Sequence, residues 1–598
     1  MSAKSGSKLF TVLMVIALAL ILGGGWLAYL VQTGGGNITV RDLRFMGHDG
    51  KVVSALLYVP KGVNAKNPAP GIVATHGYIN SRETQDGFAI EFARRGYVVL
   101  APDQSGHGYS DPPAFANAFG GADSLPYLRS LDIIDKDNVA LEGHSMGGWA
   151  SIIAAAMNPT GYKSIVITSS SPGTYGAPDG TSTFPRNAAL IYSTYDEFSQ
   201  LMWGIPVPGD IVNTDKLKKF FGTTETVEVG KLYGSIEEGT ARKLYQPKAI
   251  HPRNHFATEA IGNAIEWMQA TLEGGKEIPP SDQTWYWKEI GTFIAMIGMI
   301  LMLFPLGNYL LGTDFFKELN EAPAERKALS GWGWWVAVVI TLILPVFVYM
   351  KAWDYIGKGI LKPGALWPQQ ITNVIILWAV AVGLITLVLL LLWHFIANKK
   401  TGATLANYGL TWKDAGLKWG KIGKSVLLAF IVVFFAHLTL VISDWLFLTD
   451  YRLWVFAIKP LDEFHFAMAL NYVIPFALYL LIAGMLLHGQ LRLGRKDGSD
   501  LVGWKEMVLN VVIMIAGYIL FFIYQYAPLF SGGSLAVTTR WAPLYSIVLF
   551  QFVPIFTIVA LVSTYFYRKT GHVYVGAFIN AMLVAWIVVA GQATHFAF

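Results

Sequence analysis

The chain has 598 residues, of which 53% are apolar and only 14% are charged. Soluble domains carry about 25% charged residues, so a single soluble globule is excluded and a lipid-embedded part is indicated. The 45 Lys and Arg residues barely exceed the 40 Asp and Glu residues and form no basic run, so we expect no nucleic-acid partner. Cysteine is absent, which excludes disulfides and thiolate chemistry.

A short basic tip, residues 1–8, precedes an uncharged apolar run over residues 9–32. This run is long enough to cross a bilayer core of about 30 Å. The competing interpretation is a cleaved signal peptide. The run exceeds the usual apolar region of such peptides and no A-x-A cleavage site follows, so we expect an uncleaved transmembrane anchor.

Residues 37–278 have the composition of a soluble α/β domain, and apolar runs return over residues 286–598. Eight runs are long enough to span a membrane, over residues 289–312, 331–350, 370–397, 425–447, 466–488, 506–526, 544–567 and 572–595. With the anchor, the sequence predicts nine spans. The alternative is a re-entrant segment near Pro305, which would flip the later loops but not the α/β domain.

Nine spans put the two termini on opposite sides of the membrane, and Lys and Arg in short loops mark the cytoplasmic side. With a cytoplasmic N-terminus, the outer loops hold six such residues, Lys351, Lys358, Lys362, Arg452, Lys459 and Arg540. The cytoplasmic segments hold seventeen, Lys4, Lys8, Lys317, Arg326, Lys327, Lys399, Lys400, Lys413, Lys418, Lys421, Lys424, Arg492, Arg495, Lys496, Lys505, Arg568 and Lys569. We therefore expect a multi-pass protein of the cell membrane with residues 37–278 outside the cytoplasm.

Within residues 37–278, strand-like runs alternate with helical patterns. The runs are NITVRDLRF, VVSALLYVP, GIVATHG, YVVLAPD, NVALEGHS, SIVITSS and AALIYST, and helical patterns cover residues 84–95 and 147–157. This alternation predicts a doubly wound, mostly parallel sheet with a site at the carboxyl ends of its strands. The other part is predicted to be an all-α transmembrane domain.

A nucleophile motif follows one of these strands. In Gly143-His144-Ser145-Met146-Gly147, the serine has glycines two residues before and after it, between the run NVALE and an Ala-rich helix. This pattern is the G-x-S-x-G elbow, whose tight strand-to-helix turn leaves no room for Cβ atoms at the glycines. We expect Ser145 to be a nucleophile.

Here residues 40–275 resemble the α/β-hydrolase family. His76-Gly77-Tyr78 ends the third strand-like run, where the family places half of its oxyanion hole, and DQSGHGYS at residues 103–110 is similar to the family's turn after the next strand. The resemblance implies backbone N–H groups of Tyr78 and Met146 as oxyanion donors. His107, His144 and Asp103 are interpreted as structural residues of these motifs.

The family supplies the acid and the base after the serine in chain order. Asp196 follows the run AALIYST where the family keeps its acid, with Glu197 as the alternative. His255 precedes an amphipathic helix, as the family's base does, with His251 as the alternative and otherwise a lining histidine. The expected triad is Ser145, Asp196 and His255, which needs no cofactor. No metal-ligand pattern occurs among the twelve scattered histidines.

Two segments near the site have open interpretations. The 58 residues between Asp196 and His255 are long for one connection, and form either a lid or pocket over the catalytic mouth or an extra packing element. Ser81-Arg82-Glu83 either meets an anionic group of the substrate or forms a solvated ion pair.

The predicted spans contain scattered polar residues but no dense proton relay. Three segments, YGLTWKDAGLKWGKIGKSVLLAF, IAGMLLHGQLRLGRK and YRKTGHVYVGAFINAM, are similar to landmarks of the membrane-embedded CAAX-type protease family (CPBP) over residues 405–595. Ala483 and Gly484 stand at that family's paired glutamates, His488 at its arginine and Asn580 at a later histidine. The resemblance therefore implies a scaffold without that protease chemistry.

These features predict a membrane-anchored serine hydrolase that cleaves carboxylic esters of small molecules or lipids. A serine peptidase with the same triad is the first alternative. The second is a transporter or lipid-binding membrane protein whose hydrolase domain is regulatory. The bilayer is the expected partner, and the sequence leaves the oligomeric state open.

Overall fold

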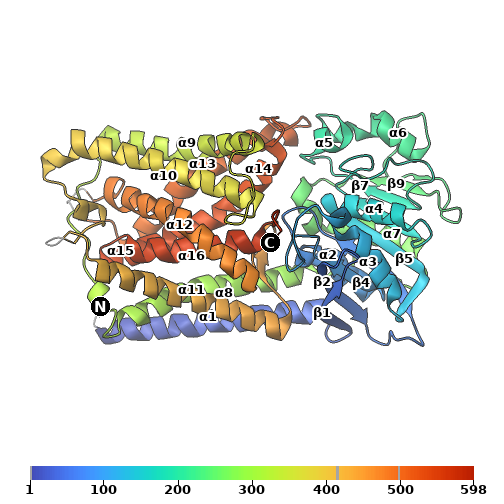
Figure 1. Cartoon of the computed structure of the whole chain (residues 1–598), viewed down its shortest axis with the longest axis horizontal. Helices are drawn as coiled ribbons and strands as arrows, with labels where there is room; N and C mark the ends of the chain where they lie inside the picture. Colours follow the sequence, from blue (N-terminus) through green and yellow to red (C-terminus); the bar gives the residue numbers. More distant parts are fainter. Residues whose placement is uncertain (1–2, 413–415, 496–498, 598) are drawn as a thin grey trace.

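The computed structural model describes residues 3–412, 416–495 and 499–597 of the chain. They form two parts (Figure 1): an α/β domain, residues 38–278, and a helical domain made of the N-terminal helix α1 and residues 286–597. The C-terminus lies where the two parts meet, and the N-terminus lies at the far end of the helical domain.

A sheet of nine strands forms the centre of the α/β domain, in the order β1-β2-β4-β3-β5-β6-β7-β9-β8. The pairs β1–β2, β2–β4 and β8–β9 are antiparallel and the rest are parallel. The strands are β1 Ile38–Met46, β2 Val52–Pro60, β3 Ala69–Thr75, β4 Val98–Pro102, β5 Ile134–His144, β6 Ser164–Thr168, β7 Ala188–Ile191, β8 Leu232–Tyr233 and β9 Arg242–Tyr245. The seven predicted strands are all present, and β8 and β9 are additions at the edge.

Helices cover both faces of this sheet. They are α2 Asp86–Arg94, α3 Gly121–Ser130, α4 Met146–Met157, α5 Ser199–Trp203, α6 Asp215–Phe221 and α7 Thr258–Thr271. Alternate strand residues face opposite sides: Val73 packs in a core with α3 and α4, whereas Ile72 and Ala74 pack in a second core with α2 and α7. Helices therefore shield both faces of the sheet from solvent, as is usual for a mostly parallel sheet.

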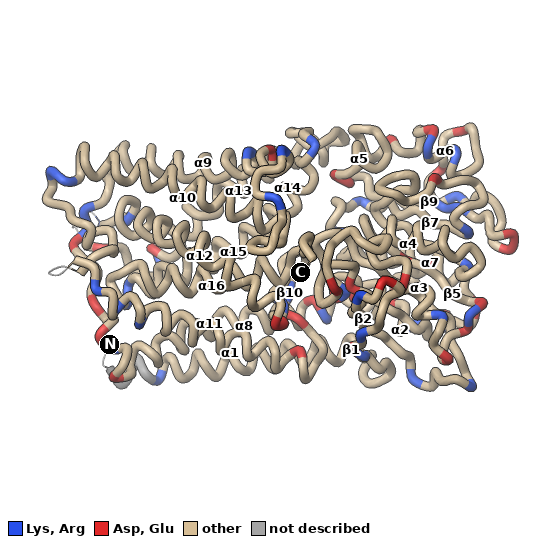
Figure 2. The backbone as a smooth tube through the Cα atoms, in the orientation of Figure 1, with Lys and Arg blue, Asp and Glu red and all other residues tan. Residues whose placement is uncertain are grey.

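Among the described residues, nine helical segments are long and apolar enough to cross a membrane. They lie in α1 Ala3–Gln32, α8 Tyr286–Leu311, α9 Gly331–Gly357, α10 Gln370–Ile396, α11 Trp419–Phe447, α12 Glu463–Met485, α13 Gly503–Phe530, the consecutive α14 Ala542–Leu549 and α15 Phe552–Thr570, and α16 Tyr574–Gly591. The helix α8 runs through Pro305 without interruption, so no re-entrant turn occurs there. Figure 2 shows few charged residues along most of these helices.

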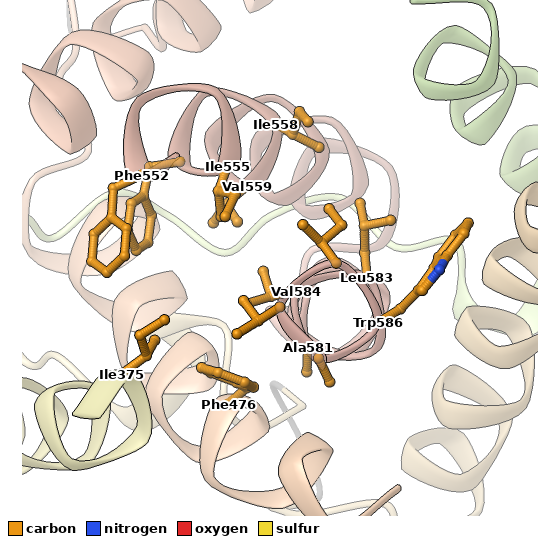
Figure 3. Packing of buried hydrophobic residues seen from close by; sticks show 14 of the residues in the cluster. Ile375, Phe476, Phe552, Ile555, Ile558, Val559, Ala581, Leu583, Val584 and Trp586 are labelled. Atoms are coloured by element: carbon orange, nitrogen blue, oxygen red, sulfur yellow. The ribbon is translucent and has the colours of Figure 1, made fainter. Parts of the chain in front are cut away.

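Helix α16 lies at the centre of the helical domain, and most of its residues are buried. Figure 3 shows its side chains Ala581, Leu583, Val584 and Trp586 pointing to different sides around the helix. The helices around it contribute further apolar side chains to the same cluster, Ile375 from α10, Phe476 from α12 and Phe552, Ile555, Ile558 and Val559 from α15. A helix that is apolar all round is expected in such a central position.

The helices before and after the α/β domain, α1 and α8, lie side by side (Figure 1). Small residues let their backbones approach closely: a Cβ on Gly291 would come within 2.7 Å of the Gly24 carbonyl oxygen, and one on Gly298 within 2.7 Å of the Ala17 carbonyl oxygen. Such small-residue contacts are a common way to pack helices in a bilayer. The α/β domain is therefore attached to the helical domain through a paired entry and exit.

The carboxyl-end loops of the sheet rest on the helical domain. Ile79 after β3 and Ile250 after β9 belong to the apolar cluster of the helices, and Tyr78 and Tyr195 pack against it. Two further segments reach the same edge. One is a hairpin between α11 and α12 with strands β10 Tyr451–Leu453 and β11 Phe456–Ile458, and the other is the C-terminal segment 592–597. The predicted catalytic edge is thus a domain interface.

Candidate active site

Ser145 occupies the turn between β5 and α4. Its backbone has φ 56° and ψ −118°, a region that residues other than glycine rarely adopt. A Cβ on Gly143 would lie 2.2 Å from the Gly147 carbonyl oxygen, and one on Gly147 would lie 2.1 Å from the Thr75 carbonyl oxygen. The turn therefore requires both glycines and holds the partly exposed Ser145 in a strained position.

Two backbone N–H groups are available beside this turn. A Cβ on Gly77 would lie 3.1 Å from the Ser145 Cβ, so the loop after β3 passes directly over the serine. The next residue, Tyr78, donates its N–H to no backbone carbonyl within the described ranges. Met146 is the first residue of α4, where N–H groups have no partner within the helix. This arrangement suits the predicted oxyanion donors.

Asp196 follows β7 and contacts a histidine, but that histidine is His251. The Nδ1 atom of His251 lies 2.9 Å from Asp196 Oδ2 and 3.0 Å from Oδ1, and both side chains are buried. Asp196 Oδ1 also accepts a hydrogen bond from the Phe198 N–H at 3.0 Å, and the Phe198 ring lies 4.5 Å from the imidazole between centroids. The carboxylate and the imidazole are thus held together on the edge that carries Ser145.

The predicted base, His255, has a different position. Its ring packs on His144 with centroids 3.8 Å apart, and both ring nitrogens are buried without a hydrogen-bond partner among the described residues. Burial holds the pKa of His255 well below its ordinary value, so the ring is neutral. The pairing expected of His255 with Asp196 is corrected: the structure gives it to His251.

Strand register explains this correction. Tyr195 and Ile250 form a parallel bridge, so the residues that follow them, Asp196 and His251, emerge side by side. His251 then begins a short 3₁₀ helix, His251–Phe256. This helix places the ring of His255 against His144, the residue before Ser145. The sequence placed a histidine correctly before the amphipathic helix α7, but only the register distinguishes the two candidates.

Glu197, the alternative acid, binds the backbone of the same histidine. Its Oε2 accepts the His251 N–H at 2.7 Å, and its Oε1 accepts the Tyr526 hydroxyl of α13 at 2.8 Å. Burial and the adjacent Asp196 raise the pKa of Glu197 to about 7. The two neighbouring carboxylates therefore hold the imidazole and the backbone of His251, respectively.

The remaining motif residues support the turn. His144 Nε2 lies 3.0 Å from the His251 carbonyl oxygen, and His76 Nε2 accepts the Gln104 N–H at 3.0 Å. Asp103 accepts the N–H groups of Arg82 at 2.8 Å and Tyr109 at 3.1 Å. These bonds tie the loop after β3 to the loop after β4, and the end of β5 to the loop after β9.

Arg82 and Glu83 are neither solvated nor placed to meet a substrate anion. Arg82 Nη1 lies 2.6 Å from Asp42 Oδ1, and Lys459 Nζ lies 2.7 Å from Glu83 Oε2, with buried Arg452 on the same carboxylate. Burial alone would raise the pKa of Glu83, but Lys459, Arg82 and Arg452 hold it well below its ordinary value. This is a buried ionic network across the domain interface.

The long connection after Asp196 packs at the sheet edge. Met202 and Trp203 of α5 and Leu217, Phe220 and Phe221 of α6 are buried in the core of the α/β domain. The connection was predicted to be either a lid or pocket over the catalytic mouth or an extra packing element. These buried side chains agree with the packing element.

No group of three or more His, Asp or Glu side chains in the described ranges is arranged to hold a metal ion. In the segments similar to CPBP proteases, His488 Nε2 lies 2.9 Å from Ser563 Oγ and Asn580 donates to the Val559 carbonyl at 3.0 Å. Ala483 and Gly484 offer no side-chain ligand at the end of α12. The scaffold role of this part stays a prediction.

Several contacts at the site were not predicted. Tyr526 reaches Glu197, His595 Nε2 lies 2.9 Å from the Tyr78 hydroxyl, and Trp454 Nε1 donates to the Pro252 carbonyl at 3.3 Å. In the sequence these residues lie in or beside predicted spans, more than 200 residues from their partners. The one signal in the sequence was that aromatic residues and histidines occur at or near the ends of the predicted spans.

Comparison with known proteins agrees with the observed fold. Residues 70–194 match the family model of the alpha/beta hydrolase fold. Monoglyceride lipase of Rattus norvegicus is 29% identical over 160 residues, which are 26% of this chain and 51% of that protein. An uncharacterized protein of Mycobacterium tuberculosis is 32% identical over 101 residues, which are 17% of this chain and 29% of that protein. The chain thus spans about half the length of the lipase.

Among solved structures, a bacterial heroin esterase is 17% identical with a TM-score of 0.31 and covers 42% of this chain and 89% of its own. An esterase of Pyrococcus furiosus is 15% identical with a TM-score of 0.30 and covers 40% of this chain and 96% of its own.

Proposed function

We propose that this protein, in which an α/β-hydrolase fold is joined to nine apolar helices within the described part of the chain, is a membrane-anchored serine hydrolase that cleaves carboxylic esters. The observation that carries the proposal is the buried pair Asp196–His251, 2.9 Å apart, on the same sheet edge as the Ser145 turn. The proposed catalytic residues are Ser145, His251 and Asp196, with the N–H groups of Tyr78 and Met146 as oxyanion donors.

In the proposed reaction, His251 accepts the Ser145 proton through Nε2 while the serine oxygen attacks the ester carbonyl carbon. Asp196, on Nδ1, fixes the tautomer and stabilises the imidazolium. Each backbone donor on the oxyanion contributes about 3–4 kcal/mol. The imidazolium then protonates the departing alcohol, which leaves an acyl-serine, and water activated by the same histidine releases the acid.

A lipid or other acyl ester is the proposed substrate class. The name of the rat relative, monoglyceride lipase, supports an acylglycerol-like ester. The position of the site adds support, because the loops of Tyr78, Tyr195 and Ile250 pack directly on the helical domain. A substrate embedded in the membrane would therefore be close to the serine.

We propose the outer side of the cell membrane as the location of the α/β domain. Seventeen Lys and Arg residues on the other side against six on this side support that orientation.

The decisive experiment labels intact cells with a membrane-impermeant fluorophosphonate probe. The wild type should be labelled and Ser145→Ala should not. Labelling of the wild type only after lysis would refute the orientation, and no labelling in either sample would refute the enzyme assignment. p-Nitrophenyl esters of increasing chain length and aminoacyl nitroanilides separate esterase from peptidase, and hydrolysis of the anilides alone would refute the ester substrate.

A further inference from the structure

One contact between the helical domain and the loop of the proposed catalytic histidine passes through a tyrosine hydroxyl. Tyr526, near the end of α13, donates to Glu197 Oε1 at 2.8 Å, and Glu197 Oε2 accepts the backbone N–H of His251 at 2.7 Å. Tyr526 and Glu197 are 4% and 6% exposed, so water does not compete for these bonds. A continuous path of two hydrogen bonds therefore joins a membrane helix to the proposed catalytic base.

Aromatic packing fixes the position of the Tyr526 ring. It lies 5.5 Å from Phe550 and 5.8 Å from Phe530 between centroids, and Phe530 in turn meets Tyr195 edge to face at 5.3 Å. Tyr195 directly precedes the acid of the triad. The hydroxyl that holds Glu197 thus belongs to a ring that is packed among other aromatic side chains.

The Glu197 carboxylate is suited to transmit this position. Its two oxygens hold Tyr526 and the His251 backbone, so a shift of the carboxylate displaces the residue whose ring must contact both Asp196 and Ser145. Displacement of a catalytic group by about 1 Å is enough to lower a rate by up to about 100-fold. Without the Tyr526 hydroxyl, Glu197 loses its hydrogen bond to the helical domain and keeps the one from the His251 N–H.

We propose that Tyr526 of the helical domain is a positioning residue for His251 that acts through Glu197, so that the helical domain forms part of the working active site. The proposal rests on the proposed serine hydrolase function. It assigns to α13 a role in the reaction beyond anchoring, although Tyr526 itself does not contact the reacting atoms.

The charge state of Glu197 gives this role a measurable signature. The titratable groups around Glu197 are Asp196, which raises its pKa, His251, which lowers it, and the hydroxyls of Tyr526 and Tyr192. A donated hydrogen bond stabilises the carboxylate form, so its removal raises the pKa of Glu197 above its value of about 7. At neutral pH a variant without the hydroxyl has a protonated Glu197 and less negative charge beside the imidazolium of the transition state.

The test compares Tyr526→Phe with Tyr524→Phe in the full-length protein in detergent. Tyr524 is on the same helix and 61% exposed, so it controls for the loss of a tyrosine hydroxyl from α13. For Tyr526→Phe we expect a kcat lower by about 10-fold at pH 7, a KM within about 2-fold, and partial recovery of kcat as the pH rises to 9. The rate of fluorophosphonate labelling should fall in parallel, and Tyr524→Phe should match the wild type.

Glu197→Gln provides the second arm, because it stays neutral at every pH. It should lower kcat by a similar factor without recovery at high pH, and the double variant should be no slower than Glu197→Gln alone. If Tyr526→Phe lowers thermal stability strongly, Glu197→Gln still tests the hydrogen-bond path from Tyr526 to His251. Wild-type rates in Tyr526→Phe, or an unchanged pH profile, would overturn the proposal. Absence of labelling in the wild type would instead refute the proposed function.

Discussion

The choice between His251 and His255 gives the sharpest prediction. Substituting His251→Ala removes the imidazole that lies 2.9 Å from Asp196, and with it the proposed general base for Ser145. Removing the base of a serine triad lowers kcat by about 10⁴ to 10⁶-fold, because the residues of the triad act as a unit. We expect that loss of kcat for His251→Ala.

His255→Ala should behave in the opposite way. The imidazole of His255 makes no hydrogen bond among the described residues and packs on His144. Its removal therefore leaves a small cavity beside His144. A loss of about 1–3 kcal/mol in the free energy of unfolding is expected, with kcat within about 10-fold of the wild type.

The assay measures kcat and KM on a p-nitrophenyl ester, the fluorophosphonate labelling rate and thermal unfolding for both variants in detergent. His144 contacts both histidines, so both variants are compared with His144→Asn as a control for disturbance of the turn. A near wild-type rate in His251→Ala together with inactivity in His255→Ala would refute the assignment of the base.

Three further predictions concern buried groups around the site. Burial raises the pKa of Glu142 to about 8, so the contribution of this group to the free energy of unfolding is complete below pH 4.5 and falls by up to ~5 kcal/mol as the pH rises to 8; Glu142→Gln should remove this contribution from the pH dependence of thermal unfolding. Lys459→Met removes the cation nearest to buried Glu83, leaves it only Arg82 and Arg452, and should lower the free energy of unfolding by up to ~3–5 kcal/mol in denaturant titrations. His595→Ala removes the contact to the Tyr78 hydroxyl and should lower kcat by about 3 to 10-fold on p-nitrophenyl esters, with unchanged thermal unfolding.

Each of these has its own control. An equal pH slope in Glu142→Gln would show that another group titrates. Lys351→Met breaks an exposed pair and should cost less than about 1 kcal/mol, so an equal effect of the two lysine variants would contradict the burial argument. For His595→Ala, a loss of kcat that Tyr78→Phe does not reproduce would indicate that the hydroxyl contact is not the cause.

Local patterns were enough to predict seven of the nine strands of the central sheet and the tight turn at Ser145. The alternation of apolar runs and the glycines at 143 and 147 are short-range features, and each has a direct steric reason in the structure. The nine apolar helices found among the described residues were predicted for the same reason, since length and composition decide whether a helix can span a bilayer.

The histidine assignment and the interface depended on long-range register. A parallel bridge between Tyr195 and Ile250 decides which histidine meets Asp196, and no local signal specifies that bridge. Likewise, Lys459 counted only as one outer-loop charge, whereas the structure buries it against Glu83, 376 positions away in the sequence. Charges that topology rules place in solvent can be structural when a second domain covers the loop.

The two domains are coupled by groups that are costly to separate. Glu83, Lys459, Arg452 and Arg82 are all buried at the interface, and leaving any one of them without its partners would place an uncompensated charge in a dry environment. Opening the interface would require water to reach these charges at the same edge that carries Asp196 and His251. The geometry of the active site and the contact between the domains are therefore maintained by the same packing, and an α/β domain without its helices is expected to lose both together.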